Sequence, residues 1–169
     1  MKSKIFILLF ASLLFAKPNL LTDFKNQQYT NLCTIKNINQ LKDEKSLSLI
    51  GISCVRTDRL YLLPFIIRKL KRTKIGRLNS IYLLTILMQK KLLYSYFFDN
   101  LNLNNFDLPD TDYIISHVFY KVKKNDFKKD KDIYIIKYTD EVIKVYKRGD
   151  KLFMDEYKDN KLIKRHWFR

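Results

Sequence analysis

The C-terminal part of the chain carries turn signals at an even spacing. The three signals lie ten residues apart, at Thr139-Asp140, Gly149-Asp150 and Asp159-Asn160. Such spacing is typical of hairpins that follow one another in an antiparallel β-meander. About five strands are therefore predicted, over Tyr113–Lys121, Asp132–Tyr138, Glu141–Arg148, Lys151–Tyr157 and Lys161–Phe168.

Side chains of successive strand residues point to opposite faces of a sheet, so alternation predicts what each face carries. One face is expected to hold the aliphatic pairs Ile133 and Ile135, Ile143 and Val145, and Leu152 and Met154. The other is expected to be aromatic and basic, with Tyr134, Tyr138, Tyr146 and Tyr157 near Lys137, Lys144 and Lys147. The sheet either packs on the rest of the chain or curls into a half-barrel.

Residues 17–100 repeat their apolar positions with a helical period. Four helices in hairpins are predicted, over Leu21–Asn37, Glu44–Arg56, Arg59–Arg72 and Arg77–Phe98, with Asp43 and Asp58 as N-caps. The last helix is apolar on most sides and is expected to be the most buried element. Residues 101–112 are rich in Asn and Asp and are expected to form a linker to the sheet, which is assigned residues 113–169. The fold class expected is α+β, an N-terminal helical bundle followed by a β-meander.

The first sixteen residues have the three parts of a secretory signal peptide. Lys2 and Lys4 precede an apolar run that ends at Ala16, where cleavage is expected. Leu14 is large for its position before the cut, so an uncleaved anchor is the alternative. Cleavage lowers the formal net charge from +16 to +14 and leaves no expected membrane span. Abundant Lys, Asn, Ile and Leu are typical of AT-rich bacterial genomes, so the periplasm is the expected compartment, with the surface or the medium as alternatives.

Cys33 and Cys54 are the only cysteines. An even number of cysteines in an exported chain favours a disulfide, and this bond would join two consecutive helices. Two reduced cysteines in the core are the alternative. A redox role is disfavoured because the chain has no Cys-x-x-Cys motif.

The positive charge is concentrated: residues 56–91 hold ten basic residues and one acidic residue. The densest cluster consists of Arg68, Lys69, Lys71, Arg72, Lys74 and Arg77. It predicts a surface that meets an acidic protein, anionic lipid or a wall polymer, and a solvated face is the alternative. Nucleic acid is disfavoured as a partner by the expected compartment.

Motifs for catalysis are missing from the sequence. Three glycines cannot build a phosphate-binding loop, and His117 and His166, both expected on strands, have no metal-ligand spacing. Asp107, Asp110 and Asp112 lack the remainder of a calcium loop and are expected to cap and form turns. Neither an enzyme nor a cofactor is therefore expected.

Size, compartment and lack of catalytic motifs together favour a non-enzymatic binding or scaffold protein. We expect an accessory component of a cell-envelope assembly, of the kind found in flagellar motors, secretion machines or pili. The alternative is a peripheral binder of anionic lipid or wall polymer that uses the basic cluster.

Overall fold

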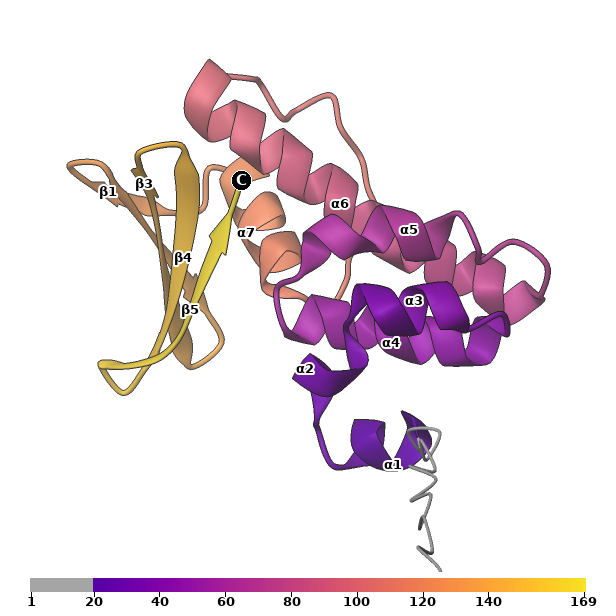
Figure 1. Cartoon of the computed structure of the whole chain (residues 1–169). Helices are drawn as coiled ribbons and strands as arrows, with labels where there is room; N and C mark the ends of the chain where they lie inside the picture. Colours follow the sequence, from indigo (N-terminus) through magenta and orange to yellow (C-terminus); the bar gives the residue numbers. More distant parts are fainter. Residues whose placement is uncertain (1–19) are drawn as a thin grey trace, which may run out of the picture.

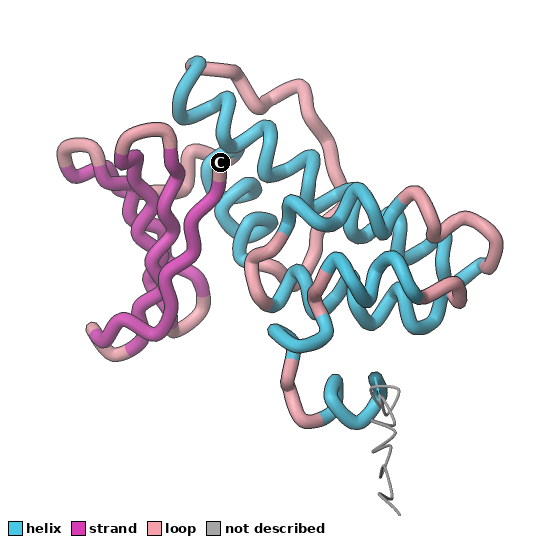
Figure 2. Tube along the Cα trace, in the orientation of Figure 1, coloured by secondary structure: helices cyan, strands magenta, loops and turns pink. Residues whose placement is uncertain are grey.

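The computed structural model describes residues 20–169, and the expected signal peptide lies outside them. The fold is α+β, with seven α-helices and one five-stranded antiparallel sheet in the described part (Figure 1). The helices and the 3-10 turn η1 are α1 (Leu20–Lys25), α2 (Tyr29–Leu32), α3 (Ile35–Gln40), α4 (Glu44–Arg56), η1 (Leu60–Leu62), α5 (Leu63–Ile67), α6 (Lys74–Asp99) and α7 (Ile114–Lys123). Figure 2 shows the helices gathered on one side of the sheet.

The N-terminal helices are shorter than predicted. The single helix expected over Leu21–Asn37 is wrong: α1, α2 and α3 replace it, because Gln27 adopts a left-handed φ of 57° and Thr34 starts a new helix by accepting from the Asn37 amide. Asp43 is confirmed as the N-cap of α4, since its carboxylate accepts from the Ser46 amide at 2.8 Å.

The segment predicted as a helix over Arg59–Arg72 is helical only in part. It forms η1 and the five-residue α5, with Pro64 in the first turn of α5. Asp58 is not an N-cap as predicted, because it has a φ of 59° and its side chain points elsewhere, as shown below. The fourth predicted helix is α6, which begins at Lys74 where Thr73 caps the Gly76 amide.

Helix α7 occupies the segment predicted as the first strand, so the strand over Tyr113–Lys121 is wrong. Its buried residues follow the helical spacing and include Ile115, Phe119 and Val122. The first strand is β1 (Lys128–Asp130), and β2 (Ile133–Tyr138), β3 (Glu141–Arg148), β4 (Lys151–Lys158) and β5 (Lys161–Phe168) follow in sheet order. The three predicted turns are confirmed between β2 and β5, with a positive φ at Thr139, Gly149, Asp159 and Asn160.

The register of β2 differs from the prediction by one residue. Ile136 pairs with Ile143, and Val145 pairs with both Tyr134 and Met154, so these residues share the face toward the helices. Ile133 and Ile135 lie on the opposite face, away from the aliphatic pairs with which they were grouped. Tyr146 does lie on that outer face as predicted, stacked on Phe153 with 5.4 Å between the ring centroids.

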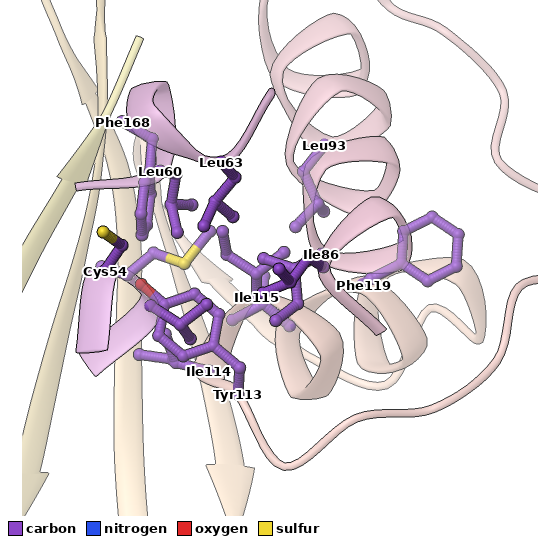
Figure 3. Packing of buried hydrophobic residues seen from close by; sticks show 14 of the residues in the cluster. Cys54, Leu60, Leu63, Ile86, Leu93, Tyr113, Ile114, Ile115, Phe119 and Phe168 are labelled. Atoms are coloured by element: carbon purple, nitrogen blue, oxygen red, sulfur yellow. The ribbon is translucent and has the colours of Figure 1, made fainter. Parts of the chain in front are cut away.

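One hydrophobic cluster runs from the helices into the sheet. Figure 3 shows Leu60 and Leu63 beside Phe168 of β5, with Leu93 of α6 on the far side of the cluster. The Cys33–Cys54 disulfide is confirmed, with a Cα–Cα distance of 4.9 Å and both residues fully buried. Residues 101–112 contain no helix or strand, and they run back beside α6 (Figure 1).

Candidate functional site

The basic cluster lies at one end of the helical part, on the loop that follows α5 and on the first turn of α6. Five of its six members are exposed: Arg68, Lys71, Arg72, Lys74 and Arg77. Lys69 is half-buried because its ammonium donates to the Ile38 carbonyl. The structure thus places the predicted residues together on the surface.

Some cations of the cluster have structural partners. The Arg77 guanidinium donates to the Arg72 carbonyl at 2.8 Å, and the Arg68 guanidinium lies 5.4 Å from the centre of the Phe65 ring. Lys71, Arg72 and Lys74 form no ion pair with any described carboxylate. These three side chains are the ones free to meet an anionic partner.

Glu44 holds the loop that carries the basic cluster, a role that sequence reasoning missed. Its carboxylate accepts from the amides of Lys71, Arg72 and Thr73, each at 2.6 Å, and from the Thr73 hydroxyl. These hydrogen bonds lower the pKa of Glu44 to about 2, and the one from the Thr73 hydroxyl has the largest effect, followed by those from the backbone amides. A Cβ on Gly76 would overlap this carboxylate, so the backbone passes close to it. The loop is therefore built around one buried anion.

A row of aliphatic side chains on α6 runs away from the basic cluster. Ile75, Leu78, Ile81, Leu84 and Met88 are 49–56% exposed. Spacings of three and four residues place Leu78, Ile81, Leu84 and Met88 on one side of the helix, and Ile75 extends the row around the first turn. The opposite side packs in the core through Leu83, Ile86 and Leu93. The prediction that this helix is the most buried element is wrong, since one apolar side of it has no partner in the described structure.

A groove of about 500 Å³ lies along this row. Its lining is almost entirely apolar and consists of Ile81, Leu84, Thr85, Leu87, Met88, Lys91, Leu108 and Pro109. Leu108 and Pro109 belong to the 101–112 segment, which is fixed to α6 by a 3.0 Å hydrogen bond from the buried Gln89 amide to the Pro109 carbonyl. The Tyr82 hydroxyl also donates to Asp112 at 2.7 Å. Both walls of the groove are thus held in place.

On α6 itself, the charges beside the apolar row have one sign, whereas Asp107 and Asp110 flank the facing wall at Leu108 and Pro109. Lys74 and Arg77 flank the beginning of the row, Lys91 lines the groove at its other end, and α6 carries no acidic residue before Asp99. Lys90 is half-buried. Its pKa is lowered mainly by this burial and, to a smaller extent, by the positive charge of Lys91. We call the aliphatic row, the groove and the flanking cations Lys74, Arg77 and Lys91 the α6 surface.

A second polar cluster joins the helices to the sheet. The Asp58 carboxylate accepts from the Tyr113 hydroxyl, lies 2.8 Å from Nδ1 of His166 and is 3.4 Å from the Lys164 ammonium. Nε2 of His166 lies 3.3 Å from the Glu156 carboxylate. Because the His166 side chain is only 3% exposed, this cluster is a structural junction.

Of the acidic loop residues, Asp110 makes a local contact of the predicted kind, whereas Asp107 and Asp112 form ion pairs with residues far away in the chain. Asp107 pairs with Lys123, Asp110 accepts from the Thr111 amide at 2.8 Å, and Asp112 pairs with Arg56 at 3.2 Å. His166 lies on β5 as expected, whereas the prediction of a strand at His117 is wrong because it lies on α7. Among residues 20–169 no group of three or more His, Cys, Asp or Glu side chains could hold a metal ion.

No protein-family model, curated protein or solved structure matches the chain. Between residues 20 and 169, no helix has the length and hydropathy needed to cross a membrane.

Proposed function

We propose that this chain is a small, exported, non-enzymatic binding protein that docks on a partner protein through the α6 surface. Its place would be as an accessory or scaffold component of a cell-envelope assembly, of the flagellar motor, secretion or pilus type. The observation that supports this proposal best is an apolar groove on α6 that has no partner in the described structure, whose lining holds one lysine and no carboxylate, and whose aliphatic row begins beside Lys74 and Arg77.

The chemistry of the α6 surface indicates the kind of partner. Exposed apolar patches with a polar rim are typical of interaction sites, and a groove accepts the protruding side chains of an amphipathic helix. Cations near both ends of the row complement acidic residues at both ends of such a helix. We therefore infer that the partner segment is amphipathic and acidic.

Anionic lipid or wall polymer is the second candidate. Lys71, Arg72 and Lys74 favour it, since they are exposed and unpaired with any described carboxylate. Clustered cations next to exposed aliphatic side chains suit a membrane surface. The groove is shallow, so its shape accepts either occupant, and the vesicle experiment below separates the two candidates.

Photo-crosslinking tests the proposal on the full chain. A photoreactive amino acid replaces Ile81 on the α6 surface, and in a control it replaces Ile163 on β5, because both isoleucines are 54% exposed. We expect a discrete protein adduct at position 81 and none at position 163. The adduct should weaken when Lys74→Glu and Arg77→Glu are combined, and the captured protein, once purified, should bind the wild-type chain. Equal labelling at both positions, or no adduct at position 81, would overturn the proposal.

Sedimentation with vesicles and with cell-wall sacculi separates the second candidate from the first. Vesicles of phosphatidylglycerol are compared with vesicles of phosphatidylcholine. Anionic vesicles or sacculi that sediment the protein at low salt but not at about 0.3 M salt, with no protein adduct at position 81, would support the second candidate. The protein-partner proposal would then be abandoned.

A further inference from the structure

A separate cavity of about 460 Å³ lies near the C-terminal end of α6, between the helices and the sheet. Its walls come from the end of α6 and the loop after it, the end of α7, and strands β1, β2 and β3. A volume of this size is in the range of small-molecule sites. The basic cluster lies at the other end of α6, which is about 39 Å long at 1.5 Å per residue. The cavity shares no lining residue with the groove of the α6 surface.

Three lysines line the cavity, and two of them have no carboxylate partner among the described residues. Lys123 pairs with Asp107 and donates to the Phe106 carbonyl at 2.9 Å. Lys129 and Lys147 form no ion pair, and Asp132 is the one carboxylate in the described lining. A net positive charge remains, and it favours an anionic ligand.

The lysines are placed by the sheet around one aromatic side chain. Tyr134 of β2 pairs directly with Lys129 of β1 on one side and with Val145 of β3 on the other. Lys147 lies two residues after Val145, so its side chain is on the same face of the sheet. The Tyr134 ring packs edge-on against Phe97 at 4.8 Å and lies 4.9 Å from Phe127, so its position is fixed by aromatic neighbours. The Lys129 ammonium lies 5.2 Å from the centre of the same ring.

Side-chain amides complete the lining: Asn100, Asn102, Asn104 and Asn125. Asn100 and Asn125 end their helices in the left-handed conformation, with φ of 57° and 54°, which turns the chain around the cavity. The side-chain oxygen of Asn102 accepts a hydrogen bond from the backbone N–H of Asn104 at 2.9 Å. An amide side chain both donates and accepts, which is the pairing that hydroxyl groups need.

We infer that this cavity binds a saccharide that carries a phosphate or carboxylate group. Lys129 and Lys147 would meet the acidic group, the asparagines would meet the hydroxyls, and the aromatic wall around Tyr134 would meet the C–H surface of the sugar ring. Binding needs no chemical step and no contribution from the α6 surface.

Calorimetric titration of the full chain tests this inference with four probes: glucose 6-phosphate, glucuronic acid, glucose and inorganic phosphate. The two acidic sugars should bind, and both should bind more tightly than glucose or inorganic phosphate. Inorganic phosphate that binds as tightly as glucose 6-phosphate would overturn the saccharide part of the inference. Acidic sugars that do not bind at millimolar concentration would overturn all of it.

Substitutions locate the site. Lys129→Gln combined with Lys147→Gln should weaken the acidic sugars at least tenfold and leave the affinity for glucose nearly unchanged. Lys137→Gln combined with Lys161→Gln removes two exposed lysines that do not line the cavity and serves as the matched control. Equal affinities for the two double variants would show that the cavity is not the site.

Discussion

His166 and Asp58 lie 108 positions apart in the chain, and Nδ1 of His166 is 2.8 Å from the Asp58 carboxylate. Asp58 follows the end of α4, and His166 lies on the last strand. The left-handed φ of Asp58 turns the chain at this point, and its carboxylate also accepts from Tyr113 at the start of α7. One carboxylate therefore connects two helices to the sheet.

Stability should depend on pH through this pair. Burial alone would disfavour both charges, but the hydrogen bond of His166 to Asp58 and the nearby Glu156 carboxylate outweigh it, so the pKa of His166 is raised above 6.5 and the pKa of Asp58 is lowered below 3.8. The contribution of His166 is thus complete below pH 6.5 and is lost as the pH rises through its folded pKa. That of Asp58 is complete above pH 3.8 and is lost as the pH falls through its folded pKa. Their joint contribution is greatest between these two values.

The variant His166→Gln measures this contribution. It should lower the free energy of unfolding by about 2 kcal/mol near pH 5.5, and by less at pH 8.5, because a hydrogen bond to a charged group is lost. His117 titrates with the opposite sign, since burial lowers its pKa, so the difference between wild type and variant is the quantity to compare. Urea unfolding at both pH values gives that difference. A difference that does not change with pH would contradict the charged pair.

Glu44→Gln should destabilise the loop between α5 and α6. An amide cannot accept from three backbone amides and a hydroxyl as a carboxylate does, and its NH₂ group would face other donors. Amides at positions 71–73 should exchange with deuterium faster, and the urea midpoint should fall. Glu141→Gln, which removes a carboxylate that makes no such contacts, is the control. Unchanged exchange in the Glu44 variant would contradict the role of this anion.

The disulfide should stabilise the helical part by about 3 kcal/mol, the value that the chain-entropy model gives for a loop of this size. Cys33→Ala combined with Cys54→Ala should lower the free energy of unfolding by at least that amount, because the two buried side chains also lose packing. Denaturant unfolding measures the loss. Mass measurement of the unreduced wild-type protein after alkylation checks the bond, and two modified thiols would contradict it.

Local signals explain which elements could be predicted from the sequence. The turn at Gly149-Asp150 and the cap at Asp43 depend on a few neighbouring residues, and both are confirmed. The strand predicted at Tyr113–Lys121 is wrong. Its apolar run is short, so it fits both the 3.6-residue period of a helix and the two-residue alternation of a strand. Burial on the helices selects α7, where Ile115, Val118 and Val122 share the side that packs in the core.

Long-range contacts explain what the sequence could not show. The carboxylate of Glu44 accepts hydrogen bonds from a loop 27 to 29 positions away in the chain, and no local sequence pattern predicts that contact. The basic cluster was visible as a run of Lys and Arg, whereas the exposed side of α6 was not. An apolar residue such as Leu84 has the same identity whether it faces the core or a partner, so only the packing of the chain distinguishes the two.

The affinity of the purified protein captured at position 81 tests the central claim most directly. Calorimetry compares the wild-type chain with Ile81→Gln and with Ile163→Gln, since both isoleucines are 54% exposed. Fully burying an isoleucine side chain contributes about 1.5–3 kcal/mol, and docking would bury the 54% of Ile81 that is exposed, so Ile81→Gln should weaken binding by about fourfold to fifteenfold. Ile163→Gln should bind as tightly as the wild type. An affinity of Ile81→Gln equal to that of the wild type would contradict docking through the α6 surface.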